Sequence, residues 1–472
     1  MLFTDPFFAL FIAPAFYALY LAINDRAAAK KWALIAASVA FYTWGEPLFV
    51  PVVIVSTAVD YGLSHWMART KTAGTRRVLV TVGILLNLGI LVFYKYADFI
   101  AANLNLVVEP LGGAPLPLLQ IALPIGVSFV VFEKISYLVD VYRGTTKPAN
   151  TFLDYALFVF LFPKLLAGPI LKYHEMERQF ADPAKVGWSD FHEGFLRTAR
   201  GMAKKVLIAD PLGAYADRVF AADAATLSAT DATLGLIAFA LQIYFDFSAY
   251  SDMAIGLART LGFQLRENFN MPYISRSLTE FWRRWHISLA TWIRDYLYIP
   301  LGGNRSGEMR LYLNLWICFL ASGIWHGASW NFVLWGAYNG LFLTLDRLFL
   351  LRFLDRAGAL VSTTVTLIIV TFGWAIFRAT SFEHLTSFTA AMSGLSSTIN
   401  GVEMQADVPL TMTVAIFLCL LPATPFFAPL QRAYEKSPLL QQAAALAIFV
   451  LWVLACGRAL AVPFKPFIYF RF

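Results

Sequence analysis

Two histidines in the sequence have neighbours that suit proton-transfer chemistry. His326 lies in an apolar run, residues 312–331, that is long enough to enter a bilayer, and it is the only acidic or basic side chain there. Ionisable groups inside a membrane are costly and usually functional, and an imidazole titrates near neutrality. We therefore interpret His326 as the base of a membrane enzyme. Small residues around it indicate a tunnel: Ser322, Gly323, Gly327, Ala328 and Ser329.

The second histidine, His286, belongs to an aromatic and basic stretch, residues 281–300. Helical spacing predicts that it shares one face of a helix with Trp282, Trp285, Leu289 and Ile293. Such a helix would lie in, or dip from, a membrane interface. Guanidinium groups bind phosphate oxygens through a planar fork, although interfacial arginines often serve only as anchors. The candidates to hold the phosphates of a donor are Arg283, Arg284, Arg294 and Arg305.

Two carboxylates, Asp246 and Asp252, lie near the end of an aromatic-rich apolar run. Intramembrane carboxylates can serve proton relays, but they can equally pair with nearby arginines. We favour structural pairing for both residues. The same two interpretations apply to Glu133, Lys134, Lys164 and Arg197.

The composition is that of a polytopic membrane protein. Of the 472 residues, 59% are hydrophobic and only 14% are charged, whereas soluble domains carry about 25% charged residues. The 42 Phe, 20 Tyr and 13 Trp suit interfacial belts. The net charge of +7 arises from basic residues in short loops between apolar runs. This pattern follows the positive-inside rule, so we expect no nucleic-acid partner.

Several other classes of site lack support in the sequence. The three cysteines lie far apart in apolar runs, which argues against a disulfide framework. The six histidines show no metal-ligand spacing, so we expect no metal site. We find no Gly-rich phosphate loop, G-x-S-x-G elbow or H-E-x-x-H motif. The serine hydrolase and zinc protease classes therefore lose most of their support.

Long apolar runs must position these residues, and a spanning helix needs about 20 apolar residues. The candidate spans are 6–23, 32–44, 47–66, 78–94, 116–140, 152–170, 196–220, 232–250, 311–330, 331–347, 358–379, 408–426 and 440–462. We expect about eleven true spans plus re-entrant pieces, with breaks near Gly126, Pro163 and Pro169. The first run is interpreted as a retained span, and residues 1–472 as one membrane domain. The basic loops predict that both termini lie outside the cytoplasm.

Five motifs together resemble the membrane-bound O-acyltransferases, and most closely the bacterial polysaccharide O-acetylases of the alginate type. They span residues 162–170, 242–256, 267–270, 281–289 and 325–330. The resemblance implies an all-α membrane fold around a central tunnel in the bacterial inner membrane. It also implies that His326 is the principal catalytic histidine. Because other branches have asparagine at the position of His286, this residue is expected to orient a reacting group rather than to gain or lose a proton. At the position of Lys164, proteins of this branch more often have glutamine, so the resemblance implies no role for Lys164.

The resemblance further implies a thioester donor from the cytoplasm, expected to be acetyl-CoA, with no permanently bound cofactor. Its expected partners are a periplasmic acetyltransferase, an exported polysaccharide acceptor and membrane lipid. D-alanyl transfer from a carrier protein is an alternative activity. A transporter or flippase is a further alternative, because it also needs buried polar residues and broken helices.

The mechanism expected from these residues is base catalysis. His326 would remove the proton of an attacking hydroxyl, and His286 would position the thioester or donate to the developing oxyanion. Near the C-terminus, Tyr469 resembles an aromatic motif on a partner peptide of the D-alanylation branch. It is expected to dock at the outer tunnel mouth, to carry the acyl group briefly, or to act as an interfacial aromatic anchor, which we favour over the carrier.

Overall fold

The fold was analysed in a computed structural model, which describes residues 3–305, 307–395, 401–462 and 466–470. Every regular element in these ranges is helical, which confirms the all-α class. The contacts divide the chain into two compact units. The first unit comprises residues 1–195 and 254–266, and the second comprises 196–253 and 267–472. A single domain over 1–472 stays a prediction.

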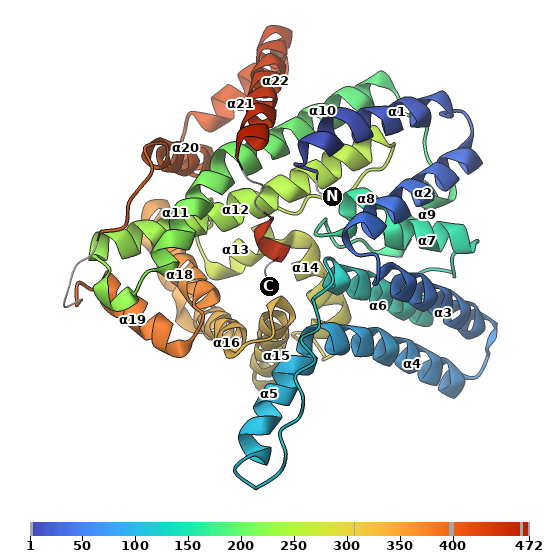
Figure 1. The fold of residues 1–472 in the computed structure, drawn as a ribbon, viewed down its shortest axis with the longest axis horizontal. Helices are drawn as coiled ribbons and strands as arrows, with labels where there is room; N and C mark the ends of the chain where they lie inside the picture. The colour runs from blue at the N-terminus through green and yellow to red at the C-terminus, as the bar shows by residue number, and fades with distance from the viewer. Residues whose placement is uncertain (1–2, 306, 396–400, 463–465, 471–472) are drawn as a thin grey trace. The chain divides into compact units, whose positions relative to one another are not determined.

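The first unit is formed by helices from the N-terminal part of the chain (Figure 1). They are α1 Ala13–Ala22, α2 Ala27–Gly45, α3 Val50–Arg69, α4 Ala73–Leu91, α5 Ala97–Val108, α6 Val127–Arg143, α7 Phe152–Phe160, α8 Phe162–Leu165 and α9 Tyr173–Ala181. Helices α3, α4 and α6 pack against one another, and α2 packs against α7 and α8. This packing buries the polar face of α6, which carries Glu133 and Lys134.

The predicted breaks in the first unit occur where glycine and proline require them. Helix α6 begins at Val127, directly after Gly126, whose φ of 84° is left-handed. A Cβ at Gly126 would lie 2.8 Å from the carbonyl oxygen of Leu165, so a side chain there would also clash. Helix α7 ends at Phe160, and the short α8 has Pro163 in its first turn.

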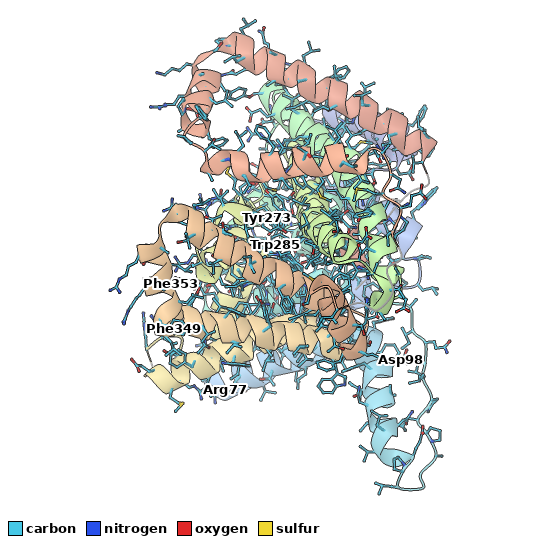
Figure 2. The ribbon with its side chains drawn as sticks, turned by 90° about the vertical axis from the view of Figure 1, so that its left-hand side faces the viewer. Arg77, Asp98, Tyr273, Trp285, Phe349 and Phe353 are labelled. Carbon is cyan, nitrogen blue, oxygen red and sulfur yellow. The ribbon has the colours of Figure 1, made fainter. Side chains whose placement is uncertain are left out.

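The second unit contains both histidines. Its helices are the end of α10 Trp188–Ala203, α11 Asp210–Ala221, most of α12 Ala229–Thr260, α13 Leu278–Arg284, α14 Ile287–Ile293, α15 Glu308–His326, α16 Trp330–Leu345, α17 Leu351–Ala357, α18 Ala359–Arg378, α19 Phe382–Met392, α20 Val408–Leu420, α21 Phe427–Lys436 and α22 Pro438–Ala461. Figure 2 shows Tyr273 and Trp285 in the interior of this unit, whereas Phe349 and Phe353 point away from it. Aromatic side chains therefore fill its core.

Four helices among the described residues are long and apolar enough to cross a membrane. They cover Ala73–Val108, Ala229–Thr260, Ala359–Arg378 and Pro438–Ala461. Helices α20 and α21, bent by 86°, form a fifth if the pair is one broken span. The chain is thus a multi-pass membrane protein, and the count of about eleven spans stays a prediction.

Candidate active site

His326 is the last residue of α15, and its ring is buried among aromatic side chains. The ring centroids of Trp325, Trp335 and Phe377 lie 4.9, 5.0 and 5.4 Å from that of the histidine. Only 6% of the residue is exposed to solvent. The apolar run of residues 312–331 is therefore two helices, with His326 at the turn between them.

The glycines around His326 serve close helix packing, which corrects their interpretation as a tunnel lining. A Cβ on Gly323 would lie 2.2 Å from the carbonyl oxygen of Phe332, and one on Gly327 would lie 2.0 Å from the Phe332 ring. Helix α16 therefore fills the space that these glycines leave, as small residues allow at membrane helix contacts. Ser322 lines the cavity described below.

His286 occupies a break between two helices, whereas the sequence pattern predicted one continuous helix. Helix α13 ends at Arg284 and α14 begins at Ile287, with His286 between them at a φ of 44°. Such a conformation is uncommon for residues other than glycine and requires support from its surroundings. All five residues of the predicted face nevertheless line one cavity: Trp282, Trp285, His286, Leu289 and Ile293.

Asn268 supports this break, a role that we did not assign from the sequence. Its backbone carbonyl accepts the Ile287 N–H at 2.9 Å, and its Oδ1 accepts the Ser288 N–H and hydroxyl at 3.2 and 2.9 Å. The His286 Nδ1 lies 3.2 Å from the same Oδ1. Since this oxygen only accepts, Nδ1 carries the proton of a neutral imidazole, and Nε2 is an acceptor. The motif at residues 267–270 was the signal that could have identified Asn268.

Burial keeps the His286 ring neutral. The residue lies outside the helices that meet the criteria for a membrane span. Desolvation lowers the pKa of its imidazole to about 3, because the low-dielectric surroundings disfavour the charged ring. A neutral His286 with its proton on Nδ1 can orient a ligand by accepting a hydrogen bond, but it cannot donate one from Nε2 to an oxyanion.

Tyr469 lies between the two histidines. Its ring centroid is 6.0 Å from that of His286 and 5.9 Å from that of His326. Phe247 of α12 packs against it at 3.9 Å and against His286 at 4.7 Å. The C-terminal aromatic residue is thus part of the histidine site.

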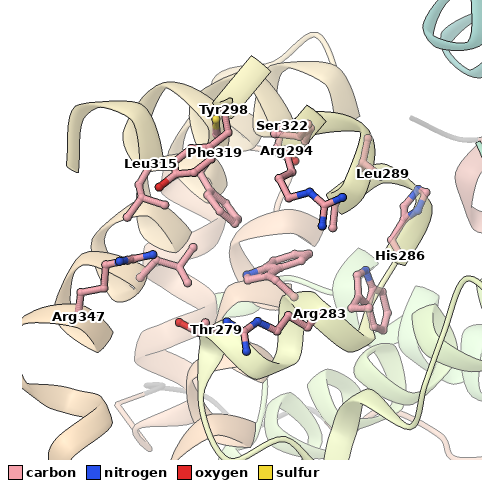
Figure 3. Close-up of a pocket in the computed structure, with 16 residues that line it drawn as sticks. Thr279, Arg283, His286, Leu289, Arg294, Tyr298, Leu315, Phe319, Ser322 and Arg347 are labelled. Carbon is pink, nitrogen blue, oxygen red and sulfur yellow. The ribbon is translucent and has the colours of Figure 1, made fainter. Parts of the chain in front are cut away.

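A cavity of about 270 Å³ lies beside His286 (Figure 3). In this view Arg347 and His286 are at opposite sides, with Arg283 and Arg294 between them. Most of the lining is apolar or aromatic, and Ser322 and Thr279 add hydroxyl groups. His326 is not among the lining residues. The cavity therefore joins an arginine-bearing region to one of the two histidines.

The candidate arginines differ in their surroundings. Arg283 and Arg294 line the cavity, and Arg294 pairs with Asp295 at 2.7 Å. Arg284 instead pairs with Glu280 at 2.8 Å and, like Arg305, is not among the lining residues. Arg347, which sequence reasoning missed, lines the cavity from the π-helical turn Asp346–Leu350. Arg347 lies far in sequence from the motif at residues 281–300, so nothing in the sequence indicated that it would line this cavity.

The second unit thus holds two buried histidines, one of which lines an arginine-bearing cavity. Residues 149–382 match the sequence model of the membrane-bound O-acyltransferase family. The chain is 42% identical to the protein named "Probable alginate O-acetylase AlgI" of Pseudomonas aeruginosa, over 81% of this chain and 73% of that protein. It is 38% identical to the protein of the same name from Pseudomonas putida, over the full length of both.

A third relative is the peptidoglycan O-acetyltransferase of Helicobacter pylori, which is 33% identical over 86% of this chain and 81% of that protein. Two of these relatives are thus named for O-acetylation of alginate and one for O-acetylation of peptidoglycan. The chain belongs to the membrane-bound O-acyltransferase family and is an acyltransferase.

Proposed function

We propose that the protein takes an acetyl group from cytoplasmic acetyl-CoA and passes it across the inner membrane for O-acetylation of an exported polysaccharide. The observation that carries this proposal is the cavity, which places three arginines and His286 on one continuous lining. The names of the relatives support acetyl as the group and a polysaccharide as the acceptor. A periplasmic transferase partner and outward-facing termini are part of the same proposal.

The cavity suits the slender arm of a thioester donor. Its volume of about 270 Å³ and its apolar walls match an acylated pantetheine chain better than a whole nucleotide. Arg283, Arg294 and Arg347 would hold the phosphates outside that arm through forked hydrogen bonds. Arg284 and Arg305 remain candidates for contacts beyond the cavity.

In the proposed reaction, His326 is the general base. It takes the proton of an attacking hydroxyl while the hydroxyl oxygen bonds to the thioester carbonyl carbon. The carbon–sulfur bond then breaks, and the thiol leaves with the proton that His326 returns. His286, neutral and fixed by Asn268, orients the donor by accepting a hydrogen bond at Nε2. Of the two roles expected from the sequence, this one is the positioning of the thioester rather than the donation to the oxyanion, and asparagine at the same position could supply it.

Two hydroxyl groups are candidates for the attack. One belongs to the acceptor, and the other is the phenol of Tyr469, which would carry the acyl group as an ester before a second hydroxyl displaces it. The position of Tyr469 between the histidines favours this direct role over interfacial anchoring. Mass spectrometry of the enzyme trapped with donor tests it. An acyl adduct on Tyr469 is expected, whereas no adduct and full activity of Tyr469→Phe would exclude the carrier.

The decisive experiment gives labelled acetyl-CoA to the purified protein and measures free CoA. Release of CoA is expected from the unmodified protein and not from a folded His326→Ala variant. A D-alanyl carrier protein is tested beside it, since turnover of that donor alone would support the alternative activity. A transporter or flippase would move substrate without consuming thioester, so labelled flux with no CoA release would overturn the proposal.

A further inference from the structure

The C-terminal segment Pro466–Phe470 is held by charged side chains that the proposed reaction does not use. Asp246 of α12 accepts the backbone N–H of Ile468 at 2.7 Å through Oδ2. Its Oδ1 accepts from the Lys205 ammonium at 2.6 Å. Both side chains are 2% exposed, so this pairing is shielded from water. The carboxylate thus bridges the lysine and the C-terminal backbone.

Lys205 itself contacts the segment at two further points. Its ammonium lies 3.4 Å from the carbonyl oxygen of Pro466 and 4.6 Å from the ring centroid of Phe467. It also pairs with Asp210 at 2.7 Å. A cation near an aromatic face and a carbonyl oxygen is attracted to both, more strongly when it is desolvated. Lys205 and Asp246 therefore form a two-residue clamp on the C-terminal segment.

We propose that Asp246 and Lys205 are positioning residues, which hold the C-terminal segment so that the Tyr469 ring stays between His286 and His326. The segment includes only one helical turn, Ile468–Phe470. One turn is too short to be stable alone, so its position depends on outside contacts. The inference rests on the proposed function for its catalytic consequence, but the clamp can be tested without that function.

On helix α12, two consecutive residues connect the clamp to the histidine site. Asp246 anchors the segment, and the next residue, Phe247, packs on both Tyr469 and His286. Loss of the carboxylate would release the N–H of Ile468 and remove one of the two carboxylates that pair with Lys205, the other being Asp210. The Tyr469 ring would then lose the backbone anchor one residue before it.

Asp252 provides a matched control on the same helix. It is also buried, and its carboxylate pairs with Arg197, Arg200 and Lys204 at 3.1, 3.2 and 2.7 Å. None of these partners belongs to Pro466–Phe470. Asp246→Ala and Asp252→Ala each remove one buried carboxylate from α12, but only the first removes a contact with the segment.

The first test measures how fast an Ile468→Cys side chain reacts with a maleimide in the purified full-length protein. Ile468 is 3% exposed, so slow labelling is expected. Adding Asp246→Ala should raise the rate about tenfold, the effect of losing one charge-assisted hydrogen bond, and adding Asp252→Ala should leave it within about twofold. The protein with its native Cys318, Cys419 and Cys456 but without Ile468→Cys gives the background. An unchanged rate with Asp246→Ala would overturn the clamp. If the Asp246→Ala variant does not fold, Lys205→Met is used in its place, and the labelling rate should again rise about tenfold.

The second test is kinetic and uses an Ile468→Pro background, which removes the N–H that Asp246 accepts but keeps Tyr469. In the parent chain, Asp246→Ala should lower kcat about tenfold with the KM for acetyl-CoA unchanged. In the Ile468→Pro chain the same substitution should have much less effect, whereas any effect of Asp252→Ala should persist. An Asp246→Ala effect of equal size in both backgrounds would refute the positioning role. If the parent shows no CoA release, the proposed function fails, and the labelling test alone decides the clamp.

Discussion

Two groups of buried ionisable side chains in this protein differ in how they are satisfied. In the first unit, Lys134 pairs with Asp60 at 3.2 Å, and Lys164 pairs with Glu133. Asn87 donates to both Asp60 oxygens at 3.0 and 3.1 Å. In the second unit, His286 and His326 lie among aromatic rings instead of opposite charges.

The difference separates structural from chemical roles. Opposite charges that neutralise each other in a buried site fix the packing of helices, and they have little capacity left to bind a ligand. Aromatic rings around an imidazole exclude water, which strengthens its electrostatic interactions with a bound group. Glu133, Lys134 and Lys164, whose roles the sequence left open, belong to the first kind.

The largest effect is expected from His326→Ala, which removes the proposed general base. Acyl transfer should fall by about 10² to 10⁴-fold, the usual contribution of a positioned general base. The thermal unfolding midpoint should stay close to that of the parent. Rates of CoA release and Tm in the same detergent measure both. Retained transfer would remove His326 from the centre of the mechanism.

Lys134→Met should produce the opposite result. It leaves the Asp60 carboxylate buried without its cation, which typically costs about 3–5 kcal/mol of stability. The activity of the molecules that remain folded should be unchanged. The double variant Asp60→Leu/Lys134→Met should recover much of the loss, because it removes both charges. Unfolding by denaturant measures this, and a double variant no more stable than the single one would contradict the pairing argument.

Substitution of the arginines that line the cavity should have a smaller effect on activity. Arg283→Gln and Arg347→Gln should each raise the KM for acetyl-CoA about tenfold, the value of one hydrogen bond to a charged group at an exposed site. Initial rates over a range of donor concentrations measure the change. Arg352→Gln, on α17 and absent from the cavity lining, is the control. Arg284→Gln and Arg305→Gln in the same series test the wider set of arginines, and an equal effect at all positions would argue against the cavity as the donor site.

The sequence predicted the class of protein better than the local geometry, and the catalytic roles of the histidines stay predictions. Membrane insertion followed from composition, His326 from the cost of burying an ionisable group, and His286 from the aromatic and basic stretch around it. The positive φ of His286 could not be predicted, because it depends on Asn268, whose side chain and backbone together support the break. The helical pattern at residues 281–293 continues through the break, so periodicity alone favours one helix.

Long-range contacts explain the remaining differences. Arg347 reaches the cavity from a segment outside the motifs, and Tyr469, for which the sequence left more than one role open, lies close to both histidines. The pairing of Asp246 was predicted, but its partners are Lys205 and the Ile468 backbone rather than arginines. Glycines near His326 predict either a tunnel or close helix contact, and only the position of Phe332 decides between them.

The smallest effect is expected from His286→Asn. An asparagine can accept the same hydrogen bond, so acyl transfer should stay within about tenfold of the parent. Since the folded pKa is about 3, the ring is neutral from pH 5 to 9 and adds no step to the pH–rate profile there. In the unfolded chain the imidazole binds a proton below about pH 6.5, so the parent loses stability as pH falls from there toward 3. His286→Asn should flatten this part of the Tm–pH curve. A large loss of activity with an altered acid limb would instead show that His286 titrates during catalysis.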